Sequence, residues 1–127
     1  MIHGIGTDIV DIRRIQSAVD QFGDRFPARI LGQNELTQYG LLSNSGKARF
    51  LAKRFSLKEA AAKALGTGFR NGVILKNFNL SHDELGKPLL RLSGKAREIA
   101  QANGVNESHV SLSDEKNYTV AYVIMTT

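Results

Sequence analysis

The residues best suited to chemistry in this chain are two carboxylates and a lysine: Asp8, Glu59 and Lys63. Glu59 and Lys63 stand at positions i and i+4, so on a helix their side chains project from one face. Asp8 comes shortly after two glycines, which let a ligand approach the backbone closely. Mg²⁺ typically takes one or two carboxylates together with substrate phosphates. The set therefore allows a magnesium site at which Lys63 handles a phosphate group.

Each of these residues also has a simpler structural explanation. Asp8 could cap the helix that follows it, and Glu59 with Lys63 could form an ordinary ion pair along a helix. The residue types alone leave both interpretations open. The three histidines, His3, His82 and His109, lack the spacing of a metal site, so spacing alone predicts ordinary hydrogen-bonded roles for them. No dinucleotide fingerprint or P-loop is complete.

Basic residues are concentrated in one part of the sequence. The chain has a net charge of +5, but residues 47–76 hold eight bases against one acid, Glu59, which is a local charge of +7. Such a window indicates either an anionic partner or a solvated lysine-rich helix face. A nucleic-acid-binding module would need aromatic residues among the bases, and the window has three phenylalanines but no tyrosine or tryptophan. We therefore expect no nucleic-acid partner.

The elements that must position these residues follow from hydrophobic periodicity. The pattern predicts a strand over 3–10, then a helix from Ile12 with Asp11 as N-cap and an interruption at Gly23 or Pro27. The clearest helix covers 47–65, carries Glu59 and Lys63, and ends at Gly66. The remaining expected elements are a helix over 33–42, strands over 73–80 and 88–92 joined by a hairpin-sized loop, a helix over 95–103, and strands over 110–113 and 118–125. This order predicts one domain over 1–127 with an α+β fold and a mixed, largely antiparallel sheet.

Composition is typical of an ordinary folded protein. The chain has 127 residues, of which 42% are apolar and 23% charged, so a hydrophobic core is available and wholesale disorder is excluded. The absence of cysteine excludes a disulfide framework, a zinc–thiolate site and a thiol nucleophile. No apolar stretch is long enough to span a membrane, and the first residues lack the basic region of a signal peptide. We expect a cytoplasmic protein without a membrane partner.

Four segments, taken together, resemble one known family. They are residues 6–12 (GTDIVDI), 50–68 (FLAKRFSLKEAAAKALGTG), 86–88 (GKP) and 109–113 (HVSLS). In this order and along the whole chain they look like the small bacterial holo-[acyl-carrier-protein] synthases, which are 4′-phosphopantetheinyl transferases. The Lys-Glu-Ala-x-x-Lys element combined with Gly-Thr-Asp is the most specific part of the resemblance.

The resemblance implies an activity and a set of site residues. The chain would transfer 4′-phosphopantetheine from coenzyme A to a serine of apo acyl carrier protein, in fatty-acid biosynthesis, and release 3′,5′-ADP. Asp8 and Glu59 match the family's Mg²⁺ ligands, and Lys63 matches the lysine at the coenzyme A pyrophosphate, which makes these three the expected catalytic residues. The positions that match residues near the nucleotide end, including the 3′-phosphate, are Arg54, Lys87, Pro88 and His109. The base that takes the serine proton stays open.

The resemblance also implies an α+β unit that assembles as a homotrimer, with active sites between subunits. One position departs from the family: Asp114 stands where many members have a histidine, so the role of that histidine cannot be transferred to this chain.

The acceptor implied by the family is a small, acidic, helical carrier protein. Arg14 matches a docking position of the family closely, and we expect Arg25 to contribute as well, in a basic region that also holds Arg13 and Arg29. Three nearby acids, Asp11, Asp20 and Asp24, offset much of that charge. A subunit that only binds the carrier protein would need these arginines but would have no need for the two carboxylates and Lys63.

Overall fold

The computed structural model describes the whole chain, residues 1–127. The elements in order are β1 (Ile2–Asp11), α1 (Ile12–Phe22), α2 (Arg25–Ile30), α3 (Gln33–Gly40), α4 (Asn44–Leu65), the 3₁₀ turn η1 (Leu75–Asn77), β2 (Phe78–His82), β3 (Pro88–Leu92), α5 (Gly94–Ala102), β4 (Glu107–Asp114) and β5 (Tyr118–Thr126). None of the helices has the length and apolar character needed to cross a membrane.

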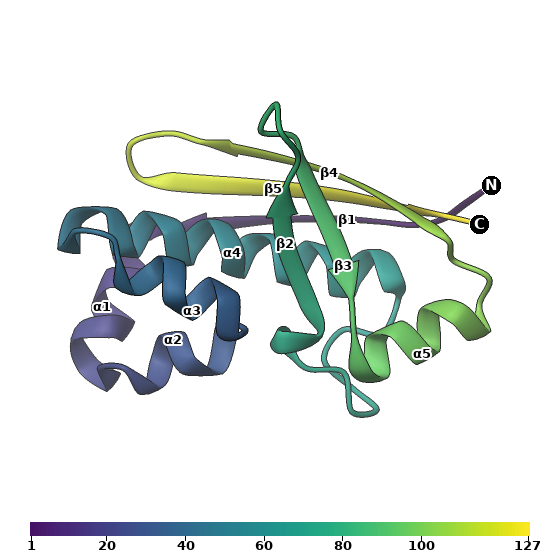
Figure 1. Cartoon of the computed structure of the whole chain (residues 1–127), viewed down its shortest axis with the longest axis horizontal. Helices are drawn as coiled ribbons and strands as arrows, with labels where there is room; N and C mark the ends of the chain where they lie inside the picture. The colour runs from purple at the N-terminus through teal and green to yellow at the C-terminus, as the bar shows by residue number, and fades with distance from the viewer.

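The five strands form two sheets, and all of their pairings are antiparallel. One sheet has the order β1-β5-β4, so strands from the two ends of the chain lie side by side, and the other is the β2–β3 hairpin. Figure 1 shows the hairpin crossing the long helix α4, while the three-stranded sheet lies along it. The expected α+β class and the antiparallel pairing are confirmed. The expected single sheet divides into two, and no parallel pair occurs.

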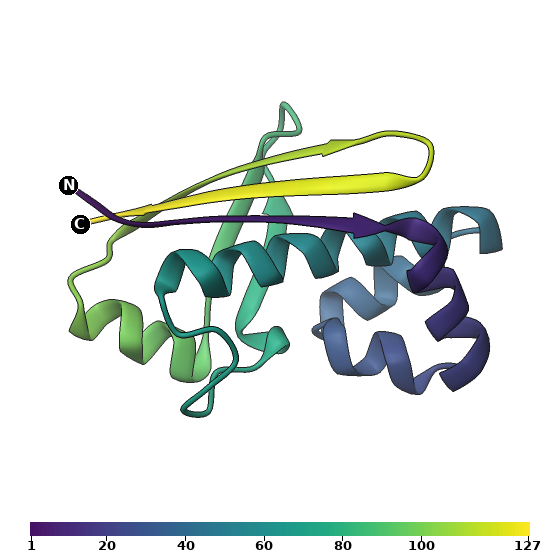
Figure 2. The same cartoon turned by 180° about the vertical axis from the view of Figure 1, so that it is seen from behind.

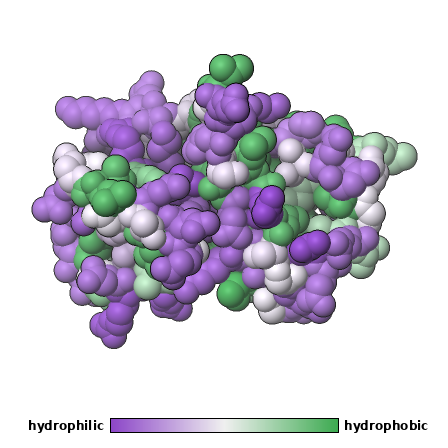
Figure 3. Space-filling model, viewed as in Figure 1, coloured by the Kyte–Doolittle hydropathy of each residue, from purple (hydrophilic) through white to green (hydrophobic).

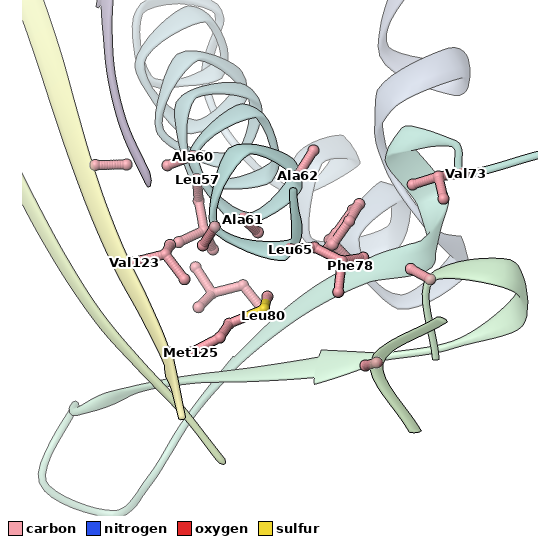
Figure 4. Close-up of a cluster of buried hydrophobic side chains, with 14 residues drawn as sticks. Leu57, Ala60, Ala61, Ala62, Leu65, Val73, Phe78, Leu80, Val123 and Met125 are labelled. Carbon is pink, nitrogen blue, oxygen red and sulfur yellow. The ribbon is translucent and has the colours of Figure 1, made fainter. Parts of the chain in front are cut away.

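Helix α4 is the central element, because it packs against both sheets. Its alanines Ala60, Ala61 and Ala64 are fully buried, and this small-residue surface lets β1 and β5 approach the helix backbone. Figure 4 shows how leucine, valine, phenylalanine and methionine side chains from α4, β2 and β5 meet in this core. A second core lies under α1–α3 and includes Ile15, Ile30 and Leu51.

Gly4 and Gly6 allow the closest of these contacts. A Cβ at either glycine would collide with the carbonyl oxygen of Ala64 or Ala60 on α4. Because these glycines carry no side chain, β1 packs directly against the backbone of α4. The next residues of β1, Thr7 and Asp8, therefore also lie beside this helix.

Several expected element boundaries are wrong: the strand expected over 110–113 covers Glu107–Asp114, and the short helix α2 was not expected. Helix α4 begins at Asn44 rather than at residue 47, because Ser43 is its N-cap and the expected turn over 43–46 is its first turn. The expected strand over 73–80 is instead a 3₁₀ turn followed by β2, since the Asn77 side chain accepts a hydrogen bond from the Ile74 amide and closes the turn. The interruption after α1 occurs at Gly23, where φ is +62°, whereas Pro27 lies inside α2.

The other capping and turn predictions are confirmed. The Asp11 side chain accepts a hydrogen bond from the Arg13 amide at the start of α1. Gly66 adopts a left-handed conformation, with φ of +92°, and ends α4. The β2–β3 and β4–β5 hairpins form as expected.

Candidate functional site

The two carboxylates and the lysine meet at the free edge of β1. The Lys63 ammonium donates to the Thr7 carbonyl oxygen at 2.9 Å and to Asp8 Oδ1 at 3.3 Å. Glu59 lies one helical turn before Lys63 on α4 and is half-buried. Strand β1 is an edge strand, with β5 as its only partner, and Figure 2 shows it running along α4. Asp8 does not cap α1, because Asp11 does so.

The surroundings of the Asp8 and Glu59 carboxylates disfavour their ionised forms. Burial raises the pKa of Asp8, although the Lys63 hydrogen bond and charge act against this rise. Burial also raises the pKa of Glu59, and the neighbouring charge of Asp8 raises it further, while Lys63 opposes both effects. One lysine therefore does not fully compensate two acids.

This donor set fits Mg²⁺. Two half-buried carboxylates supply hard oxygen ligands, and their uncompensated charge is the kind that a divalent cation offsets. No group of three or more histidine, cysteine, aspartate or glutamate side chains forms anywhere in the chain, so the protein offers these two ligands and no full cage. Phosphate and water ligands would complete the coordination of Mg²⁺ at such a site.

A groove of about 560 Å³ lies between α4, the β2–β3 hairpin and β4. The side of the molecule that carries the hairpin is predominantly hydrophilic, with smaller apolar patches (Figure 3). Of the predicted nucleotide residues, Arg54 and Pro88 line this groove, and Lys87 adjoins Pro88 with an exposed side chain. The structure therefore brings together three of the four residues expected at the nucleotide end.

Arg54 is buried, and much of its hydrogen-bonding capacity is used within the protein. Its Nη1 donates to Glu35 Oε2 at 3.3 Å and to the Leu80 carbonyl oxygen at 2.9 Å, and its Nη2 donates to Gln38 Oε1 at 3.2 Å. Its guanidinium also lies over the Phe50 ring, 4.6 Å from the centroid. Arg54 is thus a rigid part of the groove wall rather than a free surface cation.

Three residues to which the sequence analysis gave no role in the site belong to this region. Lys53 and His82 line the groove. Partial burial lowers the pKa of His82, and the charges of Arg54 and Lys53 lower it further, so the imidazole stays neutral near pH 7. Glu35 is buried behind Arg54 and accepts a 2.6 Å hydrogen bond from the ammonium of Lys58. No local sequence signal connects Glu35 to residues 54 and 58, because the three meet only through packing.

The basic window is therefore not a solvated helix face. Five of its eight bases form ion pairs: Arg49 and Lys53 with Asp114, Arg54 and Lys58 with Glu35, and Lys63 with Asp8. Lys58 has no exposed surface at all. These pairings give Asp114 a defined role in holding the β4–β5 turn against α4.

His109 is not in the groove. It lies on the outer face of β4, where its imidazole is more than half exposed and 3.5 Å from Glu107. The groove lies beside β4, whereas the cluster of Asp8, Glu59 and Lys63 (the β1 cluster) lies beside β1. Strands β1 and β4 are the two opposite edges of the three-stranded sheet. Figures 1 and 2 likewise place the hairpin and β1 on opposite sides of α4. Within one chain, the two parts of the predicted site are therefore separated.

The predicted docking residues lie on the helical corner of the molecule. Arg14 on α1 and Arg25 on α2 are exposed and form no ion pair, whereas Arg13 pairs with Asp11 at 2.8 Å. Arg25 and Arg29 line a cavity of about 410 Å³ together with Phe22 and Phe26. An adjoining, mainly apolar cavity of about 530 Å³ shares Phe26 and Arg29. The helical corner therefore combines exposed arginines that form no ion pair with cavities lined by apolar side chains.

The chain is similar to proteins of one family. A sequence profile of the 4′-phosphopantetheinyl transferase superfamily matches residues 4–123. The holo-[acyl-carrier-protein] synthase of Vibrio parahaemolyticus is 52% identical over 124 residues, which cover 98% of this chain and 97% of that protein. The crystal structure of the Neisseria meningitidis holo-[acyl-carrier-protein] synthase matches with a TM-score of 0.92 and 40% identity, over 100% of both chains. A Bacillus anthracis holo-(acyl-carrier-protein) synthase in complex with CoA (3′,5′-ADP) matches with a TM-score of 0.80 and 35% identity, over 98% of this chain and 96% of that one.

Proposed function

The chain belongs to the 4′-phosphopantetheinyl transferase superfamily and is a transferase of the holo-[acyl-carrier-protein] synthase kind, and we propose its reaction from that premise. It transfers 4′-phosphopantetheine from coenzyme A to a serine of apo acyl carrier protein and releases 3′,5′-ADP. The reaction depends on Mg²⁺ and serves fatty-acid biosynthesis in the cytoplasm. The convergence of Asp8, Glu59 and Lys63 at the β1 edge carries this proposal.

The reaction is the transfer of a phosphoryl-type group. The serine oxygen attacks the pantetheine-side phosphorus, the bond from that phosphorus to the bridging oxygen breaks, and the electron pair leaves with 3′,5′-ADP. Little covalent work falls on the protein, so positioning and charge stabilisation supply the catalysis. Lys63 lies beside the carboxylates and stabilises the charge that grows on the leaving phosphate.

Asp8 and Glu59 would hold the Mg²⁺. When bound there, the cation would offset the negative charge of the pyrophosphate. The serine proton passes to Glu59, to a bound water or to a group on the carrier protein.

The groove beside α4 is proposed to hold the nucleotide end of coenzyme A. Arg54 and Lys53 give it positive charge for a phosphate, and Pro88 and Phe50 give it apolar surface for a base. The coenzyme A complex of the Bacillus anthracis relative supports a nucleotide site in this fold.

A homotrimer would join the separated parts of the site. The outer face of the three-stranded sheet is apolar and exposed in a single chain, with Ile5, Ile9, Val120 and Tyr122 in the β1 and β5 rows. Such a face calls for a partner, and a second copy that covers it would also bury His109. The groove of one subunit would then complete the carboxylate site of its neighbour.

The helical corner is proposed to dock the carrier protein. An acidic, helical partner complements the unpaired arginines Arg14, Arg25 and Arg29, and its apolar side chains would fill the cavity beside Phe26.

One assay tests the reaction. The chain is incubated with coenzyme A, Mg²⁺ and an apo acyl carrier protein, and mass spectrometry is used to find the phosphopantetheine adduct on the serine together with free 3′,5′-ADP. Chelation of Mg²⁺ and a carrier protein without that serine serve as controls. If the chain binds the carrier protein but forms no adduct, it is a carrier-binding subunit and the proposed reaction is wrong.

A further inference from the structure

The loop at the tip of the β2–β3 hairpin is closed by a single side chain, that of Asp83. Its Oδ1 accepts hydrogen bonds from the amides of Leu85 and Lys87, both at 2.9 Å. Its backbone amide donates to the Lys87 carbonyl oxygen and its backbone carbonyl accepts from the Gly86 amide, each at 3.0 Å. The two bonds to Oδ1 depend on the Asp83 side chain, whereas the two backbone bonds would form with any residue at this position.

The chemistry of this loop requires a side-chain acceptor at position 83. A carboxylate that bonds to amides further along the chain closes a turn, and a charged acceptor strengthens such bonds. Gly86 adopts a left-handed conformation with φ of +86°, so the turn also needs a glycine there. The hydrophobic residue of the loop, Leu85, is almost fully exposed and packs on nothing that could hold the loop instead.

This loop forms one wall of the groove. Gly86 and Pro88 line it, and Lys87 lies between them. Both oxygens through which Asp83 acts, the side-chain Oδ1 and the backbone carbonyl, bond to amides of its own loop, and Asp83 itself is not a lining residue of the groove. Its influence on a bound molecule is thus indirect and passes through the loop backbone.

We propose that Asp83 is a positioning residue for the coenzyme A site, which holds Gly86, Lys87 and Pro88 in the conformation that contacts the nucleotide end. The inference rests on the proposed function, because that function assigns the groove to the nucleotide. Without the two Oδ1 bonds the loop would populate several conformations in the free protein, and binding would have to order it.

Three variants separate this role from a charge effect. Asp83→Ala removes the acceptor, Asp83→Asn keeps an acceptor oxygen but no charge, and Glu84→Ala removes a neighbouring exposed carboxylate that makes no hydrogen bond. The measurements are the Kd of 3′,5′-ADP by calorimetry, the KM of coenzyme A, the KM of the carrier protein and kcat. Asp83→Ala is expected to raise the Kd and the coenzyme A KM about tenfold, as two lost hydrogen bonds imply, with kcat and the carrier KM unchanged. Asp83→Asn should restore most of the affinity, and Glu84→Ala should match the wild type.

Two outcomes would overturn the inference. If Asp83→Ala binds 3′,5′-ADP as the wild type does, the loop needs no such closure. If the alanine and asparagine variants change affinity equally, Asp83 acts through its charge. A wild-type chain that binds neither 3′,5′-ADP nor coenzyme A would instead refute the proposed function, so the two failures are distinguishable.

Discussion

At the scale of single residues, the two carboxylates of the β1 cluster, Asp8 and Glu59, lower the stability of the fold near pH 7, as the proposed ligand site would require. The pKa of Asp8 and that of Glu59 are both raised, so the ionised pair present near pH 7 is less favourable in the fold than in the unfolded chain. Lys63 offsets this only in part. A residue pair selected for stability alone would not combine two acids at a half-buried strand edge.

Glu59→Gln should therefore stabilise the metal-free protein while it abolishes transfer. The pKa of Glu59 is higher in the folded protein than its ordinary value. As the pH rises from the ordinary pKa to the raised one, ionisation of Glu59 therefore lowers the free energy of unfolding. Glutamine cannot ionise, so the variant does not lose this stability. The melting temperature near pH 7 should rise by about 1–3 °C, a small effect because solvent screens a half-buried group. Added Mg²⁺ should raise the melting temperature of the wild type but not of the variant.

Glu84→Gln is the matched control, since this exposed carboxylate lies in the loop of the β2–β3 hairpin, and the hairpin and β1 lie on opposite sides of α4 (Figures 1 and 2). A Glu59→Gln variant that melts higher on addition of Mg²⁺, or that retains wild-type turnover, would contradict the assignment of Glu59 as a metal ligand.

At the scale of elements, α4 carries residues of both the groove and the β1 cluster, and a buried ionic network holds the helix in place. The Lys58 ammonium donates to the Ile30 carbonyl oxygen at 2.9 Å and to Glu35, whose other oxygen accepts from Arg54. Glu35 Oε1 also accepts from the Gly32 amide at the start of α3. The network thus ties α2, α3 and α4 together and holds Arg54 at the groove wall.

Glu35→Gln should cost more stability than Lys58→Met. Loss of the carboxylate charge leaves two buried cations without a counter-ion, at a cost of about 3–5 kcal/mol. Methionine at position 58 removes one cation, and Glu35 keeps Arg54 as its partner. Urea denaturation of both single variants and the double variant gives the coupling energy. If the two single effects simply add, the network does not act as a unit.

Much of this arrangement could be predicted from the sequence, because it depends on local signals. The Ala-rich run and Gly66 defined α4, and the Glu59–Lys63 spacing placed both side chains on one helix face. The strand predicted over 73–80 failed because the Asn77 side chain caps a turn within an apolar run. The sequence left open whether the basic window around Lys58 was a solvated face, since its partner Glu35 lies 23 residues away and only tertiary packing brings them together.

At the scale of the whole molecule, the chain is incomplete in two respects. It leaves one apolar sheet face uncovered, and it divides the predicted site between opposite edges of that sheet. The proposed association of copies through this face would resolve both problems at once, so we expect assembly and activity to be lost together.

Tyr122→Glu should dissociate the assembly and inactivate the enzyme. Tyr122 lies at the middle of the exposed sheet face, with Thr7 on one side and Ser111 on the other, so a charge there would be buried in the assembly but solvated in the single chain. Sedimentation should give a folded monomer with little activity, whereas Thr37→Glu, on the exposed surface of α3, should leave both properties unchanged. A fully active monomer would refute the composite site.

Complementation provides an independent check of the same idea. Glu59→Gln impairs the carboxylate edge, and Lys53→Glu impairs the groove. Each variant alone should be nearly inactive, but mixed assemblies would contain some interfaces that pair an intact groove with an intact edge. Activity should therefore recover after the two variants are unfolded and refolded together. No recovery, despite proven mixed assemblies, would mean that each chain builds its own site.

The proposed docking residues and the proposed catalytic lysine lie in different parts of the molecule, so kinetics can resolve their two roles. Lys63→Ala removes charge stabilisation at the leaving phosphate, so kcat should fall about 100-fold with little change in the carrier KM. Arg25 lies on the helical corner. Arg25→Glu should therefore raise the KM of the carrier protein about tenfold, while the KM of coenzyme A stays constant. Higher salt should shrink the effect of Arg25→Glu, because the surface charges are screened, and should hardly alter the effect of Lys63→Ala.

Arg14→Glu should behave like Arg25→Glu, and Arg97→Glu, which makes the same charge change on α5, should behave like the wild type. If Arg25→Glu raises the coenzyme A KM and spares the carrier protein, the helical corner binds the nucleotide rather than the carrier, and the docking surface must be sought elsewhere.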